Sequence, residues 1–276
     1  MKLTIITINY NNAIGLQKTI ESVFAQTSND FEYIIVDGDS TDASKEIIAR
    51  YDSFPTHPYR WISEKDNGIY HAMNKGIQLA SGDFIQFLNS GDTLVTQDVT
   101  KRMLEVIPDN CNVFYGNMLK QLPKRIIMDK GFEGRLPTMM DFYTGTLNHS
   151  PAYIKRSLFE TYGLYDESLK IVSDWKWYLQ VIVLNGVIPE YKDLDVSLFD
   201  MNGISNINSQ LEKTERKQVI AEILPILATA DYESLILQLD KINRLNRYWI
   251  TRNGIWFIER VLFKWEKWNK NRDNHY

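Results

Sequence analysis

The residues best suited to chemistry lie in four polar turns within the first 92 residues. The last turn stands in FLNSGDTL, residues 87–94, where a short apolar run passes directly into a turn with one carboxylate, Asp92. Turns also use Asn, Asp, Ser and Gly for their own backbone geometry. If the four turns lay at one edge of a sheet, their carboxylates would repel each other unless a cation or a ligand rich in hydrogen-bond donors lay between them. The turns span residues 9–12, 37–42, 64–68 and 89–92.

A repeated pattern of strand, turn and helix predicts where these turns lie. The run LTIITI at 3–8 is rich in β-branched residues and predicts a strand, and the segment after it has apolar residues at helical spacing. The pattern recurs, with a second strand to Val36, a third in YRWIS, a helix over about 69–80 and a strand that ends at the last turn. This alternation implies crossover connections and a mostly parallel sheet. Ligands bind at the carboxyl ends of such strands, so we expect the turns to meet in one crevice.

Several other kinds of site are disfavoured. No G-x-G-x-x-G follows the first strand and no G-x-x-x-x-G-K-[ST] occurs, which argues against an ordinary dinucleotide site and against a P-loop. The four histidines and the single cysteine offer no zinc-type ligand spacing. Cys111 cannot form an internal disulfide, and we interpret it as a small apolar strand residue in a protein of the reducing cytoplasm.

The composition is that of an ordinary globular protein. The chain has 276 residues, 44% hydrophobic and 24% charged, enough for one large or two ordinary domains. We expect a cytoplasmic protein, because the opening apolar run is too short for a signal peptide and no stretch of about 18 apolar residues occurs. The net charge is −4, yet from residue 244 onward eight basic residues face three acidic ones. The remaining body is acidic, which argues against a nucleic-acid-binding surface.

The pattern changes beyond residue 112. Shorter predicted strands and a loop lead to a helix predicted to begin after Ser173, with Asp174 in its first turn. A strand near 195–200 follows, and the chain from about 206 is predicted to be helical. Within it, IWFIERVLFKWEKW at 255–268 has an amphipathic pattern with basic flanks. Such a helix either lies in a membrane interface or docks on the protein or on a second copy of it.

With these elements in order, residues 1 to about 205 resemble the family 2 glycosyltransferases, inverting enzymes of the GT-A fold that take a sugar from a nucleotide-sugar. The resemblance implies an α/β fold of the GT-A, Rossmann-like type, with a mostly parallel sheet flanked by helices. It also implies a nucleotide-sugar half at about 1–116, an acceptor half at about 117–205 and a helical C-terminal extension at 206–276. The segments that carry it are TIITINYNN, IIVDGDSTDAS, SEKDNGIYHAMNKGIQLASGDFIQFLNSGDTL, HSPAYIKRSLFETYGLYDESL and SDWKWYLQ.

The resemblance further implies which residues hold the nucleotide-sugar. Ile8 and Tyr10 after the first strand, with Asp37 and Asp39 after the second, would hold the nucleoside. A carboxylate can accept the imide N–H of uracil or a ribose hydroxyl, and a tyrosine ring can cover a base. Asp37 is the stronger candidate, because Asp39 and Asp42 equally suit turn and helix-capping roles. Two further contacts, to the ribose and the diphosphate, are implied for Asp66 and Lys75.

The family's metal-binding motif, loosely Asp-x-Asp, falls on Asn89-Ser90-Gly91-Asp92, where only the last acid is present. A divalent ion such as Mg²⁺ or Mn²⁺ completes its octahedron from phosphates and water, so one carboxylate suffices when a diphosphate supplies the rest. The resemblance therefore implies that Asp92 holds the metal that neutralises the departing diphosphate. Asn89, Ser90 and Gly91 would contact the nucleotide-sugar. The alternative for Asp92 is a plain turn residue.

Inversion needs a base that takes the proton from the acceptor hydroxyl as it attacks the anomeric carbon. Asp174 in SDWKW matches the family's catalytic carboxylate. The helix dipole also favours an acid in a first turn without any catalytic role, and would lower its pKa. His149 matches a position near the acceptor and diphosphate, with a buried, hydrogen-bonded histidine as the alternative. Trp175 and Trp177 would stack on an acceptor sugar or else lie in the core.

The sequence thus predicts an inverting transfer of one sugar from a nucleotide-diphosphate sugar, expected to be UDP-linked. The expected acceptor is a glycan or lipid-linked saccharide in bacterial capsule, exopolysaccharide or lipopolysaccharide synthesis. We also expect a divalent metal cofactor, no nucleic-acid partner and a membrane contact through 255–268 at the inner face of the cytoplasmic membrane, while self-association stays open.

Two other functions remain as alternatives. Nucleotidyl transfer shares the scaffold, but it needs a basic glycine-rich loop where this chain has NYNNAIG. A non-catalytic nucleotide-sugar-binding subunit is suggested by Asn89, which stands where the first metal-binding acid is expected.

Overall fold

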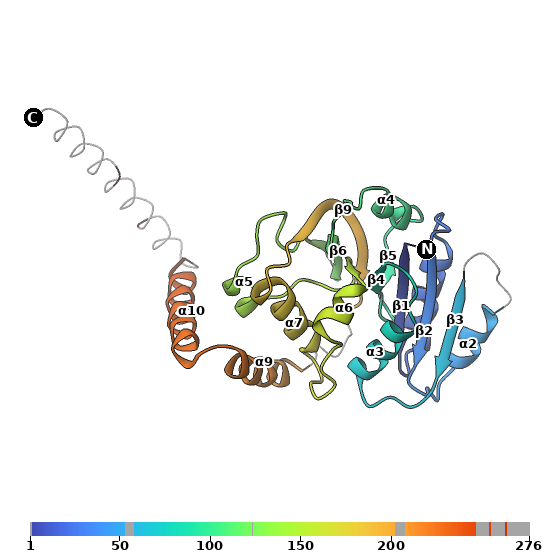
Figure 1. The fold of residues 1–276 in the computed structure, drawn as a ribbon, viewed down its shortest axis with the longest axis horizontal. Helices are drawn as coiled ribbons and strands as arrows, with labels where there is room; N and C mark the ends of the chain where they lie inside the picture. The colour runs from blue at the N-terminus through green and yellow to red at the C-terminus, as the bar shows by residue number, and fades with distance from the viewer. Residues whose placement is uncertain are drawn as a thin grey trace, which may run out of the picture. The chain divides into compact units, whose positions relative to one another are not determined.

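The computed structural model describes residues 2–52, 58–122, 124–201, 208–246, 254 and 263. These residues fall into two compact units, Met1–Val219 and Ile220–Tyr276. The first unit carries the sheet and the helices that cover it (Figure 1). The domain boundary expected near residue 205 stays a prediction, since the first compact unit extends to Val219.

Four parallel strands form the N-terminal half of the sheet, in the order β3-β2-β1-β4. Every residue of β1, β2 and β4 is buried, which explains why their sequences are apolar runs rather than alternating ones. The register pairs Asn9 with Asp37 and Asp37 with Ser63, so three strands end level with one another. The strands are β1 (Leu3–Asn9), β2 (Phe31–Asp37), β3 (Tyr59–Ser63) and β4 (Phe84–Phe87).

Three helices connect these strands: α1 (Ala13–Phe24), α2 (Ser44–Arg50) and α3 (Ile69–Leu79). Helix α3 packs against β1 and β2. A glycine, Gly76, allows this close approach, because a Cβ there would lie 2.5 Å from Cγ2 of Ile6. Helix α3 thereby holds the loop before it, residues 64–68, at the same edge of the sheet as the other turns.

Beyond β4 the sheet is mixed. β8 (Ala152–Lys155) is antiparallel to both β4 and β6 (Val113–Leu122), and β9 (Pro189–Phe199) is parallel to β6. β5 (Thr93–Leu94) and β7 (Arg125–Asp129) pair antiparallel with β9 and β6, respectively. The predicted α/β class is confirmed, with the parallel order holding through β4.

The helix that begins at the predicted position, α7 (Ser173–Tyr178), is fixed by aromatic packing and continues into the π-helical segment η1 (Leu179–Leu184). Trp175 and Trp177 are each only 2% exposed. The Trp177 ring stacks on Phe159 with centroids 4.5 Å apart, and the Trp175 indole N–H donates to the Phe142 carbonyl at 2.6 Å. Both tryptophans therefore belong to the core, and the assignment of Trp175 to an acceptor contact is corrected accordingly.

Three further helices of the first unit pack against β9, η1 and β8, respectively. They are α4 (Val99–Glu105), α5 (Met139–Thr144) and α6 (Ser157–Tyr162). Two helices, α9 (Ser209–Ile223) and α10 (Ile226–Asn246), follow in the region predicted to be helical. The amphipathic segment 255–268 lies outside the described residues except for Phe263. Within the part of the chain that the structure describes, no helix is long and apolar enough to cross a membrane.

Candidate active site

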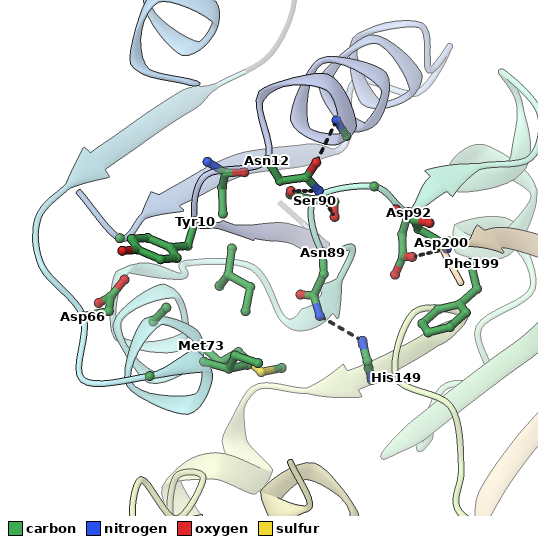
Figure 2. A pocket seen from close by; sticks show the side chains of 18 of the residues that line it. Tyr10, Asn12, Asp66, Met73, Asn89, Ser90, Asp92, His149, Phe199 and Asp200 are labelled. Atoms are coloured by element: carbon green, nitrogen blue, oxygen red, sulfur yellow. Dashed lines mark hydrogen bonds between the residues drawn. The ribbon is translucent and has the colours of Figure 1, made fainter. Parts of the chain in front are cut away.

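A cleft of about 1720 Å³ opens where β1, β2 and β4 end, and all four polar turns contribute to its wall, as predicted. Figure 2 shows Tyr10 and Asp66 at one end, Asp92 and Asp200 at the other, and Asn89 between them. Three predicted site residues, Asp37, Lys75 and Trp175, do not line the cleft. Those that line it are Ile8, Tyr10, Asp39, Asp66, Asn89, Ser90, Gly91, Asp92, His149 and Asp174.

Tyr10 and Asp66 approach each other across Gly38. A Cβ at Gly38 would lie 3.1 Å from Asp66 Oδ2 and 3.2 Å from Tyr10 Cδ2, so a side chain there would crowd both groups. Tyr10 is 69% exposed, which leaves its ring available to a planar ligand. Lys75 Nζ lies 2.7 Å from Asp66 Oδ1 and 2.7 Å from Glu64. Lys75 therefore anchors the Asp66 loop from outside the cleft.

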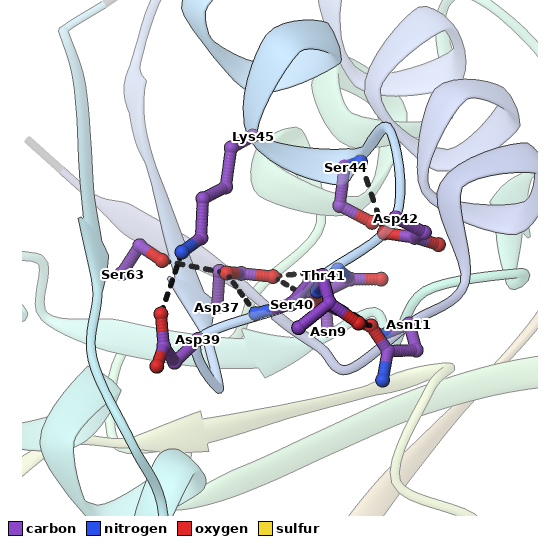
Figure 3. A network of polar contacts seen from close by, with 10 residues as sticks. All are labelled: Asn9, Asn11, Asp37, Asp39, Ser40, Thr41, Asp42, Ser44, Lys45 and Ser63. Atoms are coloured by element: carbon purple, nitrogen blue, oxygen red, sulfur yellow. Dashed lines mark hydrogen bonds and ion pairs between the residues drawn. The ribbon is translucent and has the colours of Figure 1, made fainter.

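Asp37 is fully buried and accepts four hydrogen bonds (Figure 3). The Asn9 amide donates to Oδ1 at 2.8 Å and the Ser40 hydroxyl at 2.6 Å. The Ser40 backbone N–H donates to Oδ2 at 3.0 Å and the Ser63 hydroxyl at 2.7 Å. Burial alone raises the pKa of Asp37, but these donors outweigh it and hold the pKa below its usual value. Asp37 thus joins the ends of β1, β2 and β3 instead of facing a ligand.

The two other acids of this turn differ from each other. Asp39 lines the cleft with a positive φ of 64°, and its carboxylate lies 2.5 Å from Lys45 Nζ. Asp42 accepts the backbone N–H groups of Ala13 at 2.9 Å and Ser44 at 3.0 Å. Those groups stand at the starts of α1 and α2, so Asp42 has the helix-capping role that was its alternative.

The loop of residues 89–92 is held by the N-cap of α1 and by a threonine in the middle of that helix. The Asn12 amide donates to the Ser90 carbonyl at 3.0 Å and to the Ser90 hydroxyl at 2.8 Å. Thr19 Oγ1 donates to the Asp92 carbonyl at 2.7 Å and accepts the Gly91 N–H at 2.9 Å. Gly91 has a φ of 109°, which suits glycine. These contacts give the loop a fixed course with Asp92 turned to the cleft.

Asp92 is buried but incompletely paired. Its Oδ1 accepts the Asp200 N–H at 2.8 Å, whereas Oδ2 has no hydrogen-bond partner among the described residues. Burial raises the pKa of Asp92 to about 7, against the opposing effects of the Asp200 N–H and of His149. The neighbouring Asp200 carboxylate adds to the rise.

A divalent cation fits this arrangement. The described residues contain no cluster of three or more His, Cys, Asp or Glu side chains that would hold a metal by themselves. An unpaired buried carboxylate oxygen beside a second acid is nevertheless a suitable ligand set for Mg²⁺ or Mn²⁺, when phosphate oxygens and water complete the octahedron.

Asp174 has a different partner on each oxygen. Tyr70 Oη lies 2.9 Å from Oδ1, and His149 Nδ1 lies 3.4 Å from Oδ2. Burial alone raises the pKa of Asp174, but the hydrogen bond and charge of His149, together with the Tyr70 hydroxyl, hold it below its usual value. The carboxylate is therefore ionised at neutral pH. The sequence predicts this direction from the helix dipole, whereas the structure assigns it mainly to His149.

His149 links Asp174 to the loop of residues 89–92. Its Nε2 lies 3.2 Å from the amide nitrogen of Asn89 (Figure 2). Burial lowers the pKa of His149, but the adjacent Asp174 and the charge of Asp92 reverse that effect, so the pKa is raised overall. His149 is thus hydrogen-bonded, with 20% of its side chain exposed, and it lines the cleft, so its contact with the acceptor and the diphosphate stays a prediction.

A residue of α9 supports the base region. The Glu215 carboxylate accepts the backbone N–H groups of residues 170–172 at distances between 2.7 and 3.3 Å. The Ile171 carbonyl in this segment lies 2.5 Å from Tyr70 Oη, which also contacts Asp174. Glu215 therefore fixes the backbone just ahead of α7.

Several residues of the site are not identified by sequence reasoning. Asn12 carries a detectable signal, because an asparagine directly before a helical pattern is a typical N-cap, and its Oδ1 accepts the Gly15 N–H at 3.1 Å. Tyr70, Asp200 and Glu215 carry none, since each acts on a residue far along the chain.

Comparisons with known proteins identify a family and several relatives. The family model described as Glycosyl transferase family 2 matches residues 4–162. A PGL/p-HBAD biosynthesis glycosyltransferase of Mycobacterium tuberculosis is 27% identical over 210 residues, covering 74% of this chain and 78% of that protein. An uncharacterized glycosyltransferase of the same species is 31% identical over 188 residues, covering 66% of this chain and 69% of that protein.

Two solved structures have the same fold. Residues 1–349 of S. aureus TarS in complex with UDP-GlcNAc superpose with a TM-score of 0.62 at 19% identity, covering 80% of this chain and 71% of that one. The mannosyltransferase PcManGT from Pyrobaculum calidifontis, in complex with GDP-Man and Mn²⁺, gives 0.59 at 15% identity, covering 92% and 82%. The chain spans only 42% of the longer TarS structure. The GT-A fold expected from the sequence is thereby confirmed.

Proposed function

The chain belongs to glycosyl transferase family 2 and is a glycosyltransferase, and we propose that it transfers one sugar, with inversion, from a UDP-sugar to a hydroxyl group of a glycan or lipid-linked saccharide. The observation that carries the proposal is the position of Asp174. Its ionised carboxylate lines the same cleft as Asp92, and His149 and Asn89 connect the two. A base and a leaving-group site in one cleft are what inverting transfer requires.

In this proposal Asp174 takes the proton of the acceptor hydroxyl. At the same time the hydroxyl oxygen forms a bond to the anomeric carbon, and the bond between that carbon and the diphosphate breaks. Tyr70 and His149 hold the carboxylate in place through 2.9 Å and 3.4 Å contacts. The lowered pKa of Asp174 keeps it ready to accept a proton at neutral pH. After the transfer Asp174 is a neutral carboxyl group. Its hydrogen-bonding neighbours still pair with it, which limits the cost of protonating a carboxylate in this site.

The nucleotide would occupy the other end of the cleft. Tyr10 would cover the base, and Asp66 and Asp39 offer carboxylates to its donors and to the ribose. Asp37 would act indirectly, by fixing the turn that carries Gly38 and Asp39. TarS complexes with UDP and UDP-GlcNAc support a uridine nucleotide, while the GDP-Man complex of PcManGT requires that guanosine donors be tested as well.

Asp92, with Asp200, would hold a divalent ion at the diphosphate end. When bound, such an ion supplies positive charge that neutralises the departing nucleotide diphosphate. The unpaired Oδ2 of Asp92 and the Mn²⁺ of PcManGT support this assignment. The loop contacts from Asn12 and Thr19 keep Asp92 in position without the ion.

The acceptor class and location are also proposals. The mycobacterial relatives named for PGL/p-HBAD biosynthesis support an acceptor in glycolipid or polysaccharide assembly. We place the reaction in the cytoplasm, at the inner face of the membrane.

Nucleotide release by the purified full-length chain tests the proposal. A panel of UDP-, GDP- and dTDP-sugars is assayed with and without Mn²⁺ or Mg²⁺, using wild type, Asp92→Ala and Asp174→Asn. We expect metal-dependent release of one nucleotide that both variants lose, with donor binding retained in Asp174→Asn. Asp109→Asn changes an exposed acid outside the cleft and serves as the matched control. Donor binding with no turnover, even when a membrane extract supplies acceptors, would overturn the proposed transfer and favour a binding subunit.

A further inference from the structure

We propose that Asn89 is a positioning residue for the base, in that its amide holds the His149 ring so that Nδ1 carries the hydrogen bonded to Asp174. The inference rests on the proposed function, in which Asp174 is the base. It gives Asn89 a task other than the metal ligation expected from an acid at this position.

Three side chains from three parts of the chain contact one another in series, with His149 in the middle. Asn89 follows β4, His149 precedes β8, and Asp174 lies in the first turn of α7. The Asn89 amide nitrogen lies 3.2 Å from His149 Nε2, and His149 Nδ1 lies 3.4 Å from Asp174 Oδ2. Each ring nitrogen of a histidine has its own partner here, so the partner of one nitrogen decides the role of the other.

The hydrogen-bonding capacity of the amide decides that role. An amide nitrogen can only donate, so His149 Nε2 must accept and carries no hydrogen. The hydrogen of the neutral ring then lies on Nδ1, where it faces the Asp174 carboxylate. Donor therefore meets acceptor at both ends of the ring, and Asp174 Oδ2 is held in a fixed direction.

The amide oxygen of Asn89 adds a second element. It is buried and has no hydrogen-bond partner in the described part of the chain. Rotation of the amide by half a turn would bring this acceptor to Nε2, which suits a ring protonated on both nitrogens. The asparagine amide can thus hydrogen-bond to Nε2 both in the neutral ring and in the ring protonated on both nitrogens.

An aspartate at position 89 could not do so. A carboxylate only accepts, so it requires a hydrogen on His149 Nε2. The neutral ring would then turn a bare Nδ1 toward the Asp174 carboxylate, and the two would repel. A doubly protonated ring would instead hold Asp174 more tightly and make it a weaker base. Either outcome harms the base, which gives a physical reason for an amide at this position.

The test combines NMR with kinetics on the full-length chain. Histidine is labelled with ¹⁵N, and the His149 signals are assigned among the four histidines by their absence in His149→Gln. We expect wild type to show the Nδ1–H form of His149 and Asn89→Ala to lose that preference. In steady-state assays, Asn89→Ala and Asn89→Asp should lower kcat by roughly 10- to 100-fold, the range known for groups that orient metal-bound histidines. Asn110→Ala, at an exposed asparagine, is the matched control and should change neither.

Each result has a defined meaning. An Nε2–H form in wild type, or an unchanged kcat in Asn89→Ala, would overturn the inference. An Asn89→Asp variant with higher kcat and tighter Mn²⁺ binding would also overturn it and identify Asn89 as a lost metal ligand. If Asn89→Ala unfolds, the inference is tested by the His149 tautomer in wild type and by the tautomer and kcat of Asn89→Ser. Full turnover in Asp174→Asn would refute the proposed base instead, while the NMR result would still report on Asn89.

Discussion

Two buried aspartates, Asp37 at the end of β2 and Asp92 in the turn after β4, show how differently one residue type can be used at one edge of a sheet. Their exposed fractions are 0% and 3%, so burial does not distinguish them. Asp37 accepts four hydrogen bonds and its pKa is held low, against the effect of burial. The Asp92 carboxylate accepts one hydrogen bond from the described residues, donated by the Asp200 N–H, while its Oδ2 has no partner among them and burial raises its pKa to about 7.

The difference lies in the supply of donors. A buried carboxylate whose oxygens are all paired stabilises the fold, because its charge is compensated in the native state. One that lacks donors costs stability and keeps its capacity for a ligand. Asp174 resembles Asp37 in its pairing, because each of its oxygens has a partner and its pKa is lowered, but unlike Asp37 it lines the cleft. The Asp37 network is therefore scaffold. The proposed chemical part of the molecule consists of Asn89, Asp92, His149 and Asp174.

The catalytic rate should separate the two regions most strongly. Asp174→Asn removes the group that accepts the proton, and we expect kcat to fall by about 10²- to 10⁴-fold with donor binding retained. Asp37→Asn should instead weaken donor binding while kcat at saturating donor stays close to wild type, because the turn is loosened and the base is intact. Single-turnover rates and calorimetric donor titration of both variants measure the contrast. A catalytically dead Asp37→Asn with native stability would contradict the division.

Stability against pH should separate Asp92 next. Its folded pKa is raised from the usual 3.8 to about 7, so its favourable contribution is present below 3.8 and is lost as the pH rises through 7. Metal-free wild type should therefore be less stable than Asp92→Asn at pH 8, by up to about 4 kcal/mol, while the two converge near pH 4. Urea unfolding at both pH values measures the difference, and Mn²⁺ with UDP should reduce it by stabilising wild type alone. Equal stabilities at pH 8 would mean that Asp92 is better solvated than its contacts indicate.

Asp37 should show the opposite sign. Its folded pKa is lowered, so its contribution is present above the unfolded value of 3.8 and is lost as the pH falls through the folded pKa. Asp37→Asn should be less stable than wild type at pH 7 by roughly 1–3 kcal/mol, because the amide replaces an acceptor oxygen with a donor inside the network. Ser63→Ala, which removes one donor, should lose less. Thermal unfolding of the two variants would argue against the network if their order were reversed.

The sequence predicts the scaffold and the meeting of the turns because both depend on local patterns. Alternating strands and helices place the carboxyl ends of β1, β2 and β4 together, and the polar turns follow from that. The pairing of each carboxylate is not local. The donors to Asp37 include Ser63, 26 residues away, and the bond to Asp92 comes from Asp200, 108 residues away. Asp37 consequently ranks above Asp39 as a nucleoside contact in the sequence, whereas in the structure Asp39 lines the cleft and Asp37 does not.

The mixed half of the sheet and the core tryptophans escape prediction for a related reason. Antiparallel partners such as β4 and β8 are separated by more than sixty residues of irregular pattern, so no periodicity joins them. Trp175 lies on a short helix where either side could face a ligand. The Phe142 carbonyl, which accepts its N–H at 2.6 Å, decides the question from 33 residues away.

The smallest effect should come from Glu215, which supports the chemical part without touching it. Its carboxylate accepts three backbone N–H groups in residues 170–172, and the family match ends at residue 162, well before it. Glu215→Gln keeps one acceptor oxygen, so we expect its kcat to be only a few-fold lower, and that of Glu215→Ala lower still. Each lost hydrogen bond costs about 1 kcal/mol, and this cost falls on a loop rather than on the reacting atoms. Lys217→Gln, an exposed neighbour on α9, is the matched control. If Glu215→Ala lowered stability but left kcat unchanged, α9 would belong with the Asp37 network as scaffold. A loss as large as that of Asp174→Asn would show that the chemical part of the molecule extends into α9.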